Sequence, residues 1–126
     1  MAMFKTTDEI IQIVYGLLGS ISVKKYMRKK PTTANDTEYI VINCLPIPAN
    51  VMQIVIFNVN YHTKNLASGV PDITKLMSNG ISILNILQKY TGPNYLIDFE
   101  SQDTISEEAL GESFTNLRFS FKYINN

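Results

Sequence analysis

Hydrophobic residues recur with the period of a helix at two places along the chain. The first lies between residues 10 and 18, where apolar side chains return every three to four positions. Thr6 or Thr7 can cap this helix. Asp8 and Glu9 suit its first turn, where the helix dipole favours negative charge, and Gly19 is a natural end. We therefore expect an amphipathic helix of about 12 residues, or roughly 18 Å.

The second helical stripe begins near Asp72 and stops at the Thr-Gly-Pro of residues 91–93, which ends a helix firmly. Its apolar positions are Ile73, Leu76, Met77, Gly80, Ile81, Leu84 and Leu87, widened by Ile83 and Ile86. A glycine inside a helix costs about 1 kcal/mol relative to alanine. We expect Gly80 to be present because the helix packs closely against a sheet.

Five further segments have the composition or the two-residue alternation of β-strands. In chain order they are residues 20–27, 38–45, 52–62, 95–102 and 116–124, and the first of them is the weakest. The third places Phe57 and Val59 on one face and Asn58, Asn60 and His62 on the other. Because both faces begin apolar and one turns polar, we expect a central strand whose far end leaves the core.

The remaining segments are polar. Residues 63–71 have the composition of a loop, and so does the acidic stretch 101–113, with one helical turn at 107–110. The predicted order is α-β-β-β-α-β-β, without internal repeats or a linker. We therefore expect one domain over residues 1–126, of the α+β class, with two helices packed on one face of a mostly antiparallel sheet.

Composition limits the chemistry available to this chain. Its 126 residues are 45% hydrophobic and 17% charged, which is enough for a core without disulfides or metals. With one cysteine, Cys44, and one histidine, His62, no internal disulfide and no common zinc-ligand set can form. There is also no glycine-rich phosphate-binding motif. We therefore expect no cofactor and no metal ion.

Two pairs of residues could in principle form a catalytic nucleophile and its base, but both have a simpler structural interpretation. Ser22 and Lys25 fit a Ser-x-x-Lys spacing but lack the companion motifs of that chemistry. Cys44 and His62 could meet if their strands are adjacent. A buried thiol and a histidine at a strand end are the simpler interpretation. We expect no enzymatic activity.

Charged and polar residues interrupt the apolar run near the start of the chain. No secretory signal and no membrane-spanning stretch is therefore predicted there. We expect a protein that is made and kept in a reducing cytoplasm.

The formal charge is zero, but it is unevenly distributed. Residues 1–64 have a net charge of +3, and residues 65–126 have a net charge of −3. A basic cluster consists of Lys24, Lys25, Arg28, Lys29 and Lys30, and an acidic cluster consists of Asp98, Glu100, Asp103, Glu107, Glu108 and Glu112. If the clusters lie on different sides, copies of the chain can attract each other head to tail and close into a ring.

The order of these features resembles the tail-terminator, or tail-completion, proteins of tailed bacteriophages and prophages. The similar part opens with the helix Ile10–Leu18, the strand Val23-Lys24-Lys25-Tyr26 and the basic turn Arg28-Lys29-Lys30-Pro31. It continues with Glu38-Tyr39-Ile40-Val41-Ile42, the strand from Gln53 through Asn58-Val59-Asn60-Tyr61, and Pro71-Asp72 before the long second helix and a Phe-rich final strand. The likeness covers nearly the whole chain as a pattern.

The resemblance implies a small α+β subunit, not an enzyme, that assembles into a six-membered ring on the end of the tail tube. The ring stops tube growth and offers a docking surface to head-neck proteins. The implied partners are copies of itself, the tail tube protein and a head-completion protein, with DNA passing through the ring without sequence-specific contact and no membrane involved. The implied location is the virion neck or tail, after assembly in the host cytoplasm. By charge and expected exposure, the contact segments are the basic cluster, the acidic cluster and residues 61–72.

Two other functions stay open at this point. The basic cluster could bind nucleic-acid phosphates, in which case binding would weaken steeply with salt. Asp98 and Glu100 lie two residues apart on a strand, roughly 6–7 Å from each other, and a small enzyme could use them if an apolar pocket surrounds them. Carboxylates that share one solvated face have similar pKa values, which disfavours that chemistry.

Overall fold

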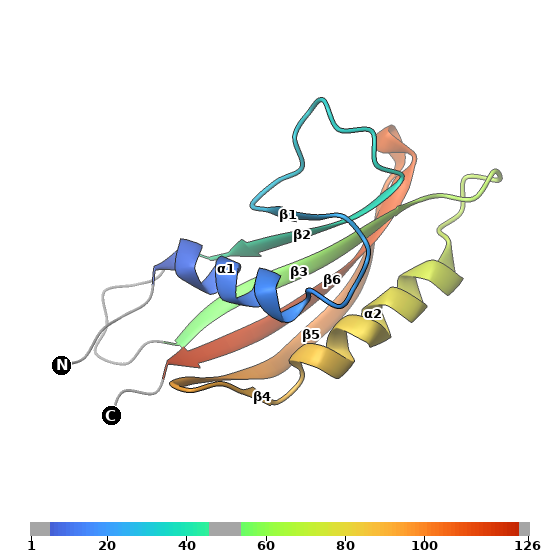
Figure 1. Cartoon of the computed structure of the whole chain (residues 1–126). Coiled ribbons are helices and arrows are strands. Elements are labelled where there is room, and N and C mark those ends of the chain that lie inside the picture. The colour runs from blue at the N-terminus through green and yellow to red at the C-terminus, as the bar shows by residue number, and fades with distance from the viewer. Residues whose placement is uncertain (1–5, 46–53, 124–126) are drawn as a thin grey trace.

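The computed structural model describes residues 6–45 and 54–123. Its elements, in chain order, are α1 (Thr7–Leu17), β1 (Lys25–Met27), β2 (Glu38–Cys44), β3 (Ile54–Lys64), α2 (Ile73–Leu87), β4 (Tyr90–Thr91), β5 (Tyr95–Glu107), the short 3-10 helix η1 (Glu108–Leu110) and β6 (Glu112–Tyr123) (Figure 1). The α+β class is confirmed. The order agrees with the prediction except for β4, which has only two residues and so carries no alternation.

The strands form one sheet in the order β1-β2-β3-β6-β5-β4. β1 runs parallel to β2, and the other neighbouring strands are antiparallel. Figure 1 shows both helices on the same side of the sheet, with α1 near β1 and β2 and α2 near β3, β5 and β6. The predicted arrangement, two helices on one face of a mostly antiparallel sheet, is therefore confirmed.

The hydrophobic core fills the space between the helices and this face of the sheet. Phe57, Val59 and Tyr61 of β3 point into the core, as their alternation predicts, and are fully buried. Phe119 of β6 lies beside Phe57, and the two ring centroids are 5.2 Å apart. Burying one such side chain contributes about 1.5–3 kcal/mol. The two central strands therefore supply much of the surface on which the helices pack.

Both helices begin where the sequence predicts. Thr6 is the N-cap of α1, and it forms a capping box with Glu9. Asp72 caps α2 because its side chain accepts a hydrogen bond of 3.2 Å from the Lys75 amide. These caps satisfy backbone amides that have no partner within the helix.

Gly80 is buried against the sheet, on the side of α2 that faces β6. A methyl group at this position would lie 3.7 Å from Cγ2 of Thr115, which is an ordinary contact distance. Gly80 therefore packs against the sheet as expected, but this packing does not explain the glycine, since the space would also accept an alanine.

The stretch 101–113, predicted to be a loop, is the outer half of a long hairpin. β5 continues to Glu107, η1 turns the chain, and β6 begins at Glu112. The helical turn predicted at 107–110 is confirmed as η1, and Gly111 follows it with a φ of 66°. The loop prediction was wrong because residues 101–106 are polar or exposed throughout and therefore show no apolar alternation.

The other strand boundaries differ from the predictions by a few residues. Only Lys25–Met27 of the weak segment 20–27 is strand, and β3 extends to Lys64. Positions 52, 53 and 124 of the predicted strands lie outside the described residues. Within residues 6–45 and 54–123, no helix has the length and apolar character needed to cross a membrane.

Candidate interaction surfaces

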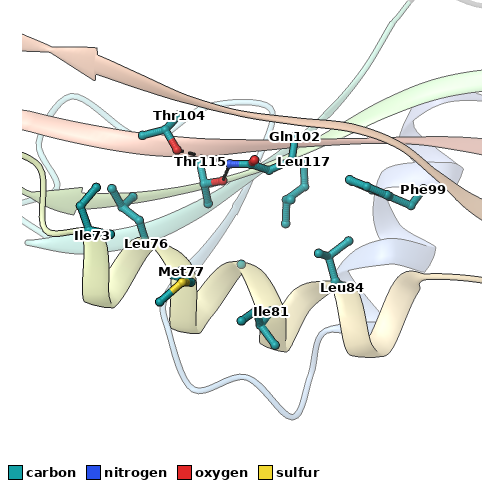
Figure 2. A pocket seen from close by; sticks show the side chains of 11 residues that line it. Ile73, Leu76, Met77, Ile81, Leu84, Phe99, Gln102, Thr104, Thr115 and Leu117 are labelled. Atoms are coloured by element: carbon teal, nitrogen blue, oxygen red, sulfur yellow. Dashed lines mark hydrogen bonds between the residues drawn. The ribbon is translucent and has the colours of Figure 1, made fainter.

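An apolar groove lies between α2 and the β5–β6 hairpin, on the helix side of the sheet (Figure 2). Its volume is about 380 Å³. The lining is mostly apolar and comes from Ile73, Leu76, Met77, Gly80, Ile81, Leu84, Phe99, Gln102, Thr104, Thr115 and Leu117. Ile73 and Met77 are each 60% exposed, and Ile81 is 51% exposed. A row of large apolar side chains open to solvent is typical of an interaction site.

The groove exists because the apolar stripe of α2 is wider than the sheet can cover. The buried positions of the helix are Leu76, Gly80, Ile83 and Leu87. Across the groove from the exposed row, the hairpin presents Phe99 and Leu117 together with the polar side chains of Gln102, Thr104 and Thr115. Gln102 donates hydrogen bonds to Thr104 Oγ1 at 3.3 Å and to Thr115 Oγ1 at 2.9 Å. These groups bond to one another, so the apolar side chains are left as the main surface for a partner.

The groove borders an open edge of the sheet. β4 pairs with β5 only at Leu96 and Ile97. From Asp98 to Glu107, none of the described strands lies on that side of β5. The opposite edge of the sheet is β1, which has three residues. Such edges present backbone groups that can pair with another chain.

The basic cluster lies around β1, and two of its members bind groups of the same chain. Arg28 donates hydrogen bonds to Asp8 at the start of α1, with Nη2 2.8 Å from Oδ1. Lys25 donates from Nζ to the backbone carbonyls of Ile21 and Val23, at 2.5 and 3.2 Å. The Ser-x-x-Lys spacing therefore places this ammonium on backbone oxygens.

The other three basic residues are more available to a partner. Lys24 and Lys29 are exposed. Lys30 is half-buried, with Nζ 4.6 Å from the centre of the Tyr39 ring. Whether the whole cluster contacts a partner stays a prediction. Because Arg28 and Lys25 are bound within the chain, fewer cations are available to a partner than the five in the sequence, which leaves less charge for contacts with nucleic-acid phosphates.

The acidic cluster lies along β5 and at the end of the hairpin, far from β1 in the strand order. Its exposed members are Glu100, Asp103 and Glu108, and Asp98 is half-buried. Glu107 and Glu112 instead approach His62 of the same chain. The structure thus puts Glu100 and Asp103 near one edge of the sheet and Lys24 and Lys29 near the other, as a head-to-tail contact requires. At the hairpin end the clusters are not separated, since Lys30 lines a pocket together with Leu110 and Glu112.

The structure separates the candidate catalytic pairs. Cys44 faces the core opposite Phe57, whereas His62 lies on the other face of β3. The register of β5 against β6 shifts at Glu100, which breaks the regular alternation that the prediction assumed for Asp98 and Glu100. Neither carboxylate lines the apolar groove.

Aromatic rings surround His62 on the face of the sheet away from the helices. Tyr39 and Phe114 flank the imidazole, and each ring centroid is 4.5 Å from it. The Tyr39 hydroxyl donates a 2.6 Å hydrogen bond to Glu112 Oε1. Burial lowers the pKa of His62 although Glu112 opposes this effect, and burial raises the pKa of Tyr39. Burial thus favours the neutral form of both side chains.

A row of amides runs beside these rings. Asn58 donates to Asn43 Oδ1 at 3.1 Å, and Asn116 donates to Oδ1 of Asn58 and Asn60, at 3.1 and 2.6 Å. Arg118 Nε adds a 3.3 Å contact to Asn58. The far end of β3 was expected to leave the core, and this was wrong, because Tyr61 belongs to the core and His62 and Thr63 are buried as well. Asn58 is also buried, and its hydrogen bonds across three strands compensate for this.

Sequence reasoning missed two features of these surfaces. The groove was missed because a stripe of apolar residues does not reveal which part of it the sheet covers; the width of the α2 stripe was the available signal. The meeting of His62, Glu107 and Glu112 was missed because Glu107 was assigned to a loop. Once the hairpin register is known, Glu107 pairs with Glu112, and Glu112 lies two positions from Phe114, the partner of His62, on the same face of the sheet.

Comparison with known proteins shows a likeness in fold. No family model matches the chain, and no curated protein matches it. Among solved structures, the fold is similar to that of a chain in a structure described as the virion of a native gene transfer agent (GTA) particle. The two chains share 10% sequence identity with a TM-score of 0.53, over 90% of this chain and 85% of the other. At this identity the likeness establishes a shared fold and leaves function to be argued from the surfaces.

Proposed function

We propose that this chain is a structural protein of a phage-like virion, and that it forms the tail-terminator or neck ring between the tail tube and the head proteins. The single observation that carries this proposal is the similarity in fold to a chain of a gene transfer agent virion, which spans nine-tenths of this chain. The resemblance of the sequence to tail-terminator proteins supports the finer role. In this role the chain works by binding other subunits and catalyses no reaction.

The proposed contact between copies joins the two edges of the sheet. The β1 edge carries the exposed cations Lys24 and Lys29, and the β5 edge carries Glu100 and Asp103. A head-to-tail contact between unlike surfaces generates a ring when the rotation closes. Opposite charges at the two edges select this orientation over head-to-head contacts, because those would place like charges together.

The apolar groove gives this contact a hydrophobic centre. Met27, on the β1 edge, is 47% exposed and lies on the helix side of the sheet, as the groove does. When β1 of one copy lies along β5 of the next, Met27 reaches the groove beside Phe99 and Met77. An apolar centre with a charged rim is the usual anatomy of a protein interface.

Charge-swap variants test this contact. We expect native mass spectrometry at low salt to detect a closed ring for the wild type, alone or with the tail tube subunit of the same virus. Replacing Lys24 and Lys29 by Glu should abolish the ring, and adding Glu100→Lys and Asp103→Lys should restore it. Lys122→Glu on the central strand β6 is the matched control and should leave the ring intact.

High salt should weaken the ring because it screens exposed charges beyond about 8–10 Å. A particle that stays monomeric at high concentration, with and without the tube subunit, would contradict the proposal. So would a quadruple charge swap that assembles no better than the double variant.

A further inference from the structure

The imidazole of His62 is held in one orientation by its neighbours. Tyr39 lies nearly parallel to it, at an interplanar angle of 8°, and Phe114 covers the other side at 25°. His62 is 9% exposed, so the ring has little freedom to move. Its Nδ1 atom is buried and makes no hydrogen bond with any described residue. A buried polar atom without a partner is costly and calls for an explanation.

Two carboxylate oxygens converge on this nitrogen. Glu112 Oε1 lies 3.4 Å from Nδ1, and Glu107 Oε1 lies 3.6 Å from it. These distances are long for a hydrogen bond, which is typically 2.7–3.2 Å. They are close to the separation of about 3.3–3.6 Å between two ligand atoms of a tetrahedral zinc ion with bonds near 2.0–2.2 Å. All three ligand atoms lie within 4.8 Å of one another.

Contrary to the expectation from composition that the chain binds no metal ion, we propose that His62, Glu107 and Glu112 bind one divalent transition-metal ion, with zinc as the expected ion. Nδ1 and the two carboxylates supply three ligands, and water fills the fourth position. The site links β3 to both strands of the hairpin. Metal binding at this site does not depend on the ring proposed above, because the site lies on the other face of the sheet from the groove.

The surroundings of the site position its ligands. Tyr39 donates its hydroxyl proton to Glu112 Oε1, which orients that carboxylate as groups hydrogen-bonded to metal ligands do elsewhere. The side chain of Glu107 is 37% exposed, so an ion can enter past it from solvent. Lys30 works against binding, since its ammonium lies over Tyr39 and its charge also lowers the pKa of His62.

Calorimetric titration of tag-free protein with zinc chloride tests the proposal. His62 is the only histidine in the chain and Cys44 is buried, so a stoichiometry of one ion per chain would point to this site. We also expect zinc to raise the melting temperature, because an ion that binds the folded state stabilises it. Magnesium is the control ion and should bind far more weakly, since it prefers six oxygen ligands.

Three variants locate the ion. Glu107→Gln should weaken zinc binding by at least about tenfold, as loss of a ligand or its support commonly does. Glu108→Gln, at the exposed neighbouring position, is the matched control and should bind as the wild type does. Lys30→Met should strengthen binding, because it removes a positive charge near the ion.

His62→Gln should abolish binding, with folding checked by circular dichroism. If that variant fails to fold, Glu107→Gln decides the matter, because its side chain is partly exposed and its loss is tolerable. The proposal is overturned if zinc gives neither heat nor a change in melting temperature with the wild type. It is also overturned if Glu107→Gln binds zinc as tightly as Glu108→Gln does.

Discussion

The two helices begin with similar caps and carry similar apolar stripes, but they bury those stripes to different extents. In α1, Ile10, Ile11 and Val14 are almost completely inaccessible to solvent. In α2, one side of the stripe is equally buried, while Ile73 and Met77 stay mostly exposed along the groove. The difference means that α1 buries its stripe in the core, whereas α2 buries one side of its stripe and leaves the other side open to the partner proposed above.

The largest expected effect is a loss of stability that differs between core substitutions in α1 and groove substitutions in α2. Ile10→Ala in α1 should lower the free energy of unfolding by about 2–5 kcal/mol, because it leaves a cavity in the core. Ile81→Ala in α2 should change it by less than about 1 kcal/mol, since that side chain is half exposed. Urea denaturation of the two variants measures both. Equal losses would show that the groove side of α2 is as important for folding as α1.

Removal of the caps should affect both helices alike. Thr6→Ala and Asp72→Ala each remove a side-chain acceptor from the first turn. Each should cost about 0.5–2 kcal/mol. Denaturation with urea provides the comparison. A cap that matters in one helix only would mean that the helices differ in more than their burial.

Alanine in place of glycine should stabilise both helices slightly. Gly80→Ala in α2 should add about 0.4–1 kcal/mol, because the new methyl group meets only Thr115 at an ordinary distance. Gly16→Ala in α1 faces open space and should also stabilise, by less because it lies near the helix end. Thermal unfolding detects both changes. A destabilised Gly80→Ala variant would show that α2 packs more tightly on the sheet than its geometry indicates.

The smallest effect concerns pH and should be independent of both helices. Burial holds the pKa of His62 below the ordinary value of 6.5, so the unfolded chain takes up this proton first. Stability contributed by the neutral imidazole is present above pH 6.5 and is lost as the pH falls below it. Urea unfolding curves at several pH values measure how the free energy of unfolding changes with pH. Ile10→Ala and Ile81→Ala should leave this pH dependence unchanged, and His62→Gln should reduce it. An unchanged pH dependence in His62→Gln would assign it to other groups.

Much of the fold could be predicted because its signals are local. Apolar spacing marked α1 and α2, single polar residues marked their caps, and alternation marked the buried parts of β3 and β6. The outer half of the hairpin could not be predicted in this way. Residues 101–106 form strand because β6 pairs with their backbone, and their side chains, polar except for the exposed Ile105, carry no trace of that pairing.

The candidate sites were less predictable because they depend on register and coverage. His62, Glu107 and Glu112 meet through the pairing of three strands, which neighbouring residues in the sequence do not encode. The charge clusters could be located from the sequence alone, but Arg28 shows the limit of that reasoning. Its partner, Asp8, lies 20 residues earlier in the chain, so a residue that looked available for a partner is already engaged.

The central claim, that the exposed side of α2 is reserved for assembly, is tested most directly by native mass spectrometry of Met77→Glu. The control is Ser78→Glu, which adds the same charge to an exposed neighbouring position outside the groove. Measured alone and with the tail tube subunit, the wild type and Ser78→Glu should form a ring, and Met77→Glu should stay monomeric with an unchanged melting temperature. A Met77→Glu variant that assembles as the wild type does would contradict the account.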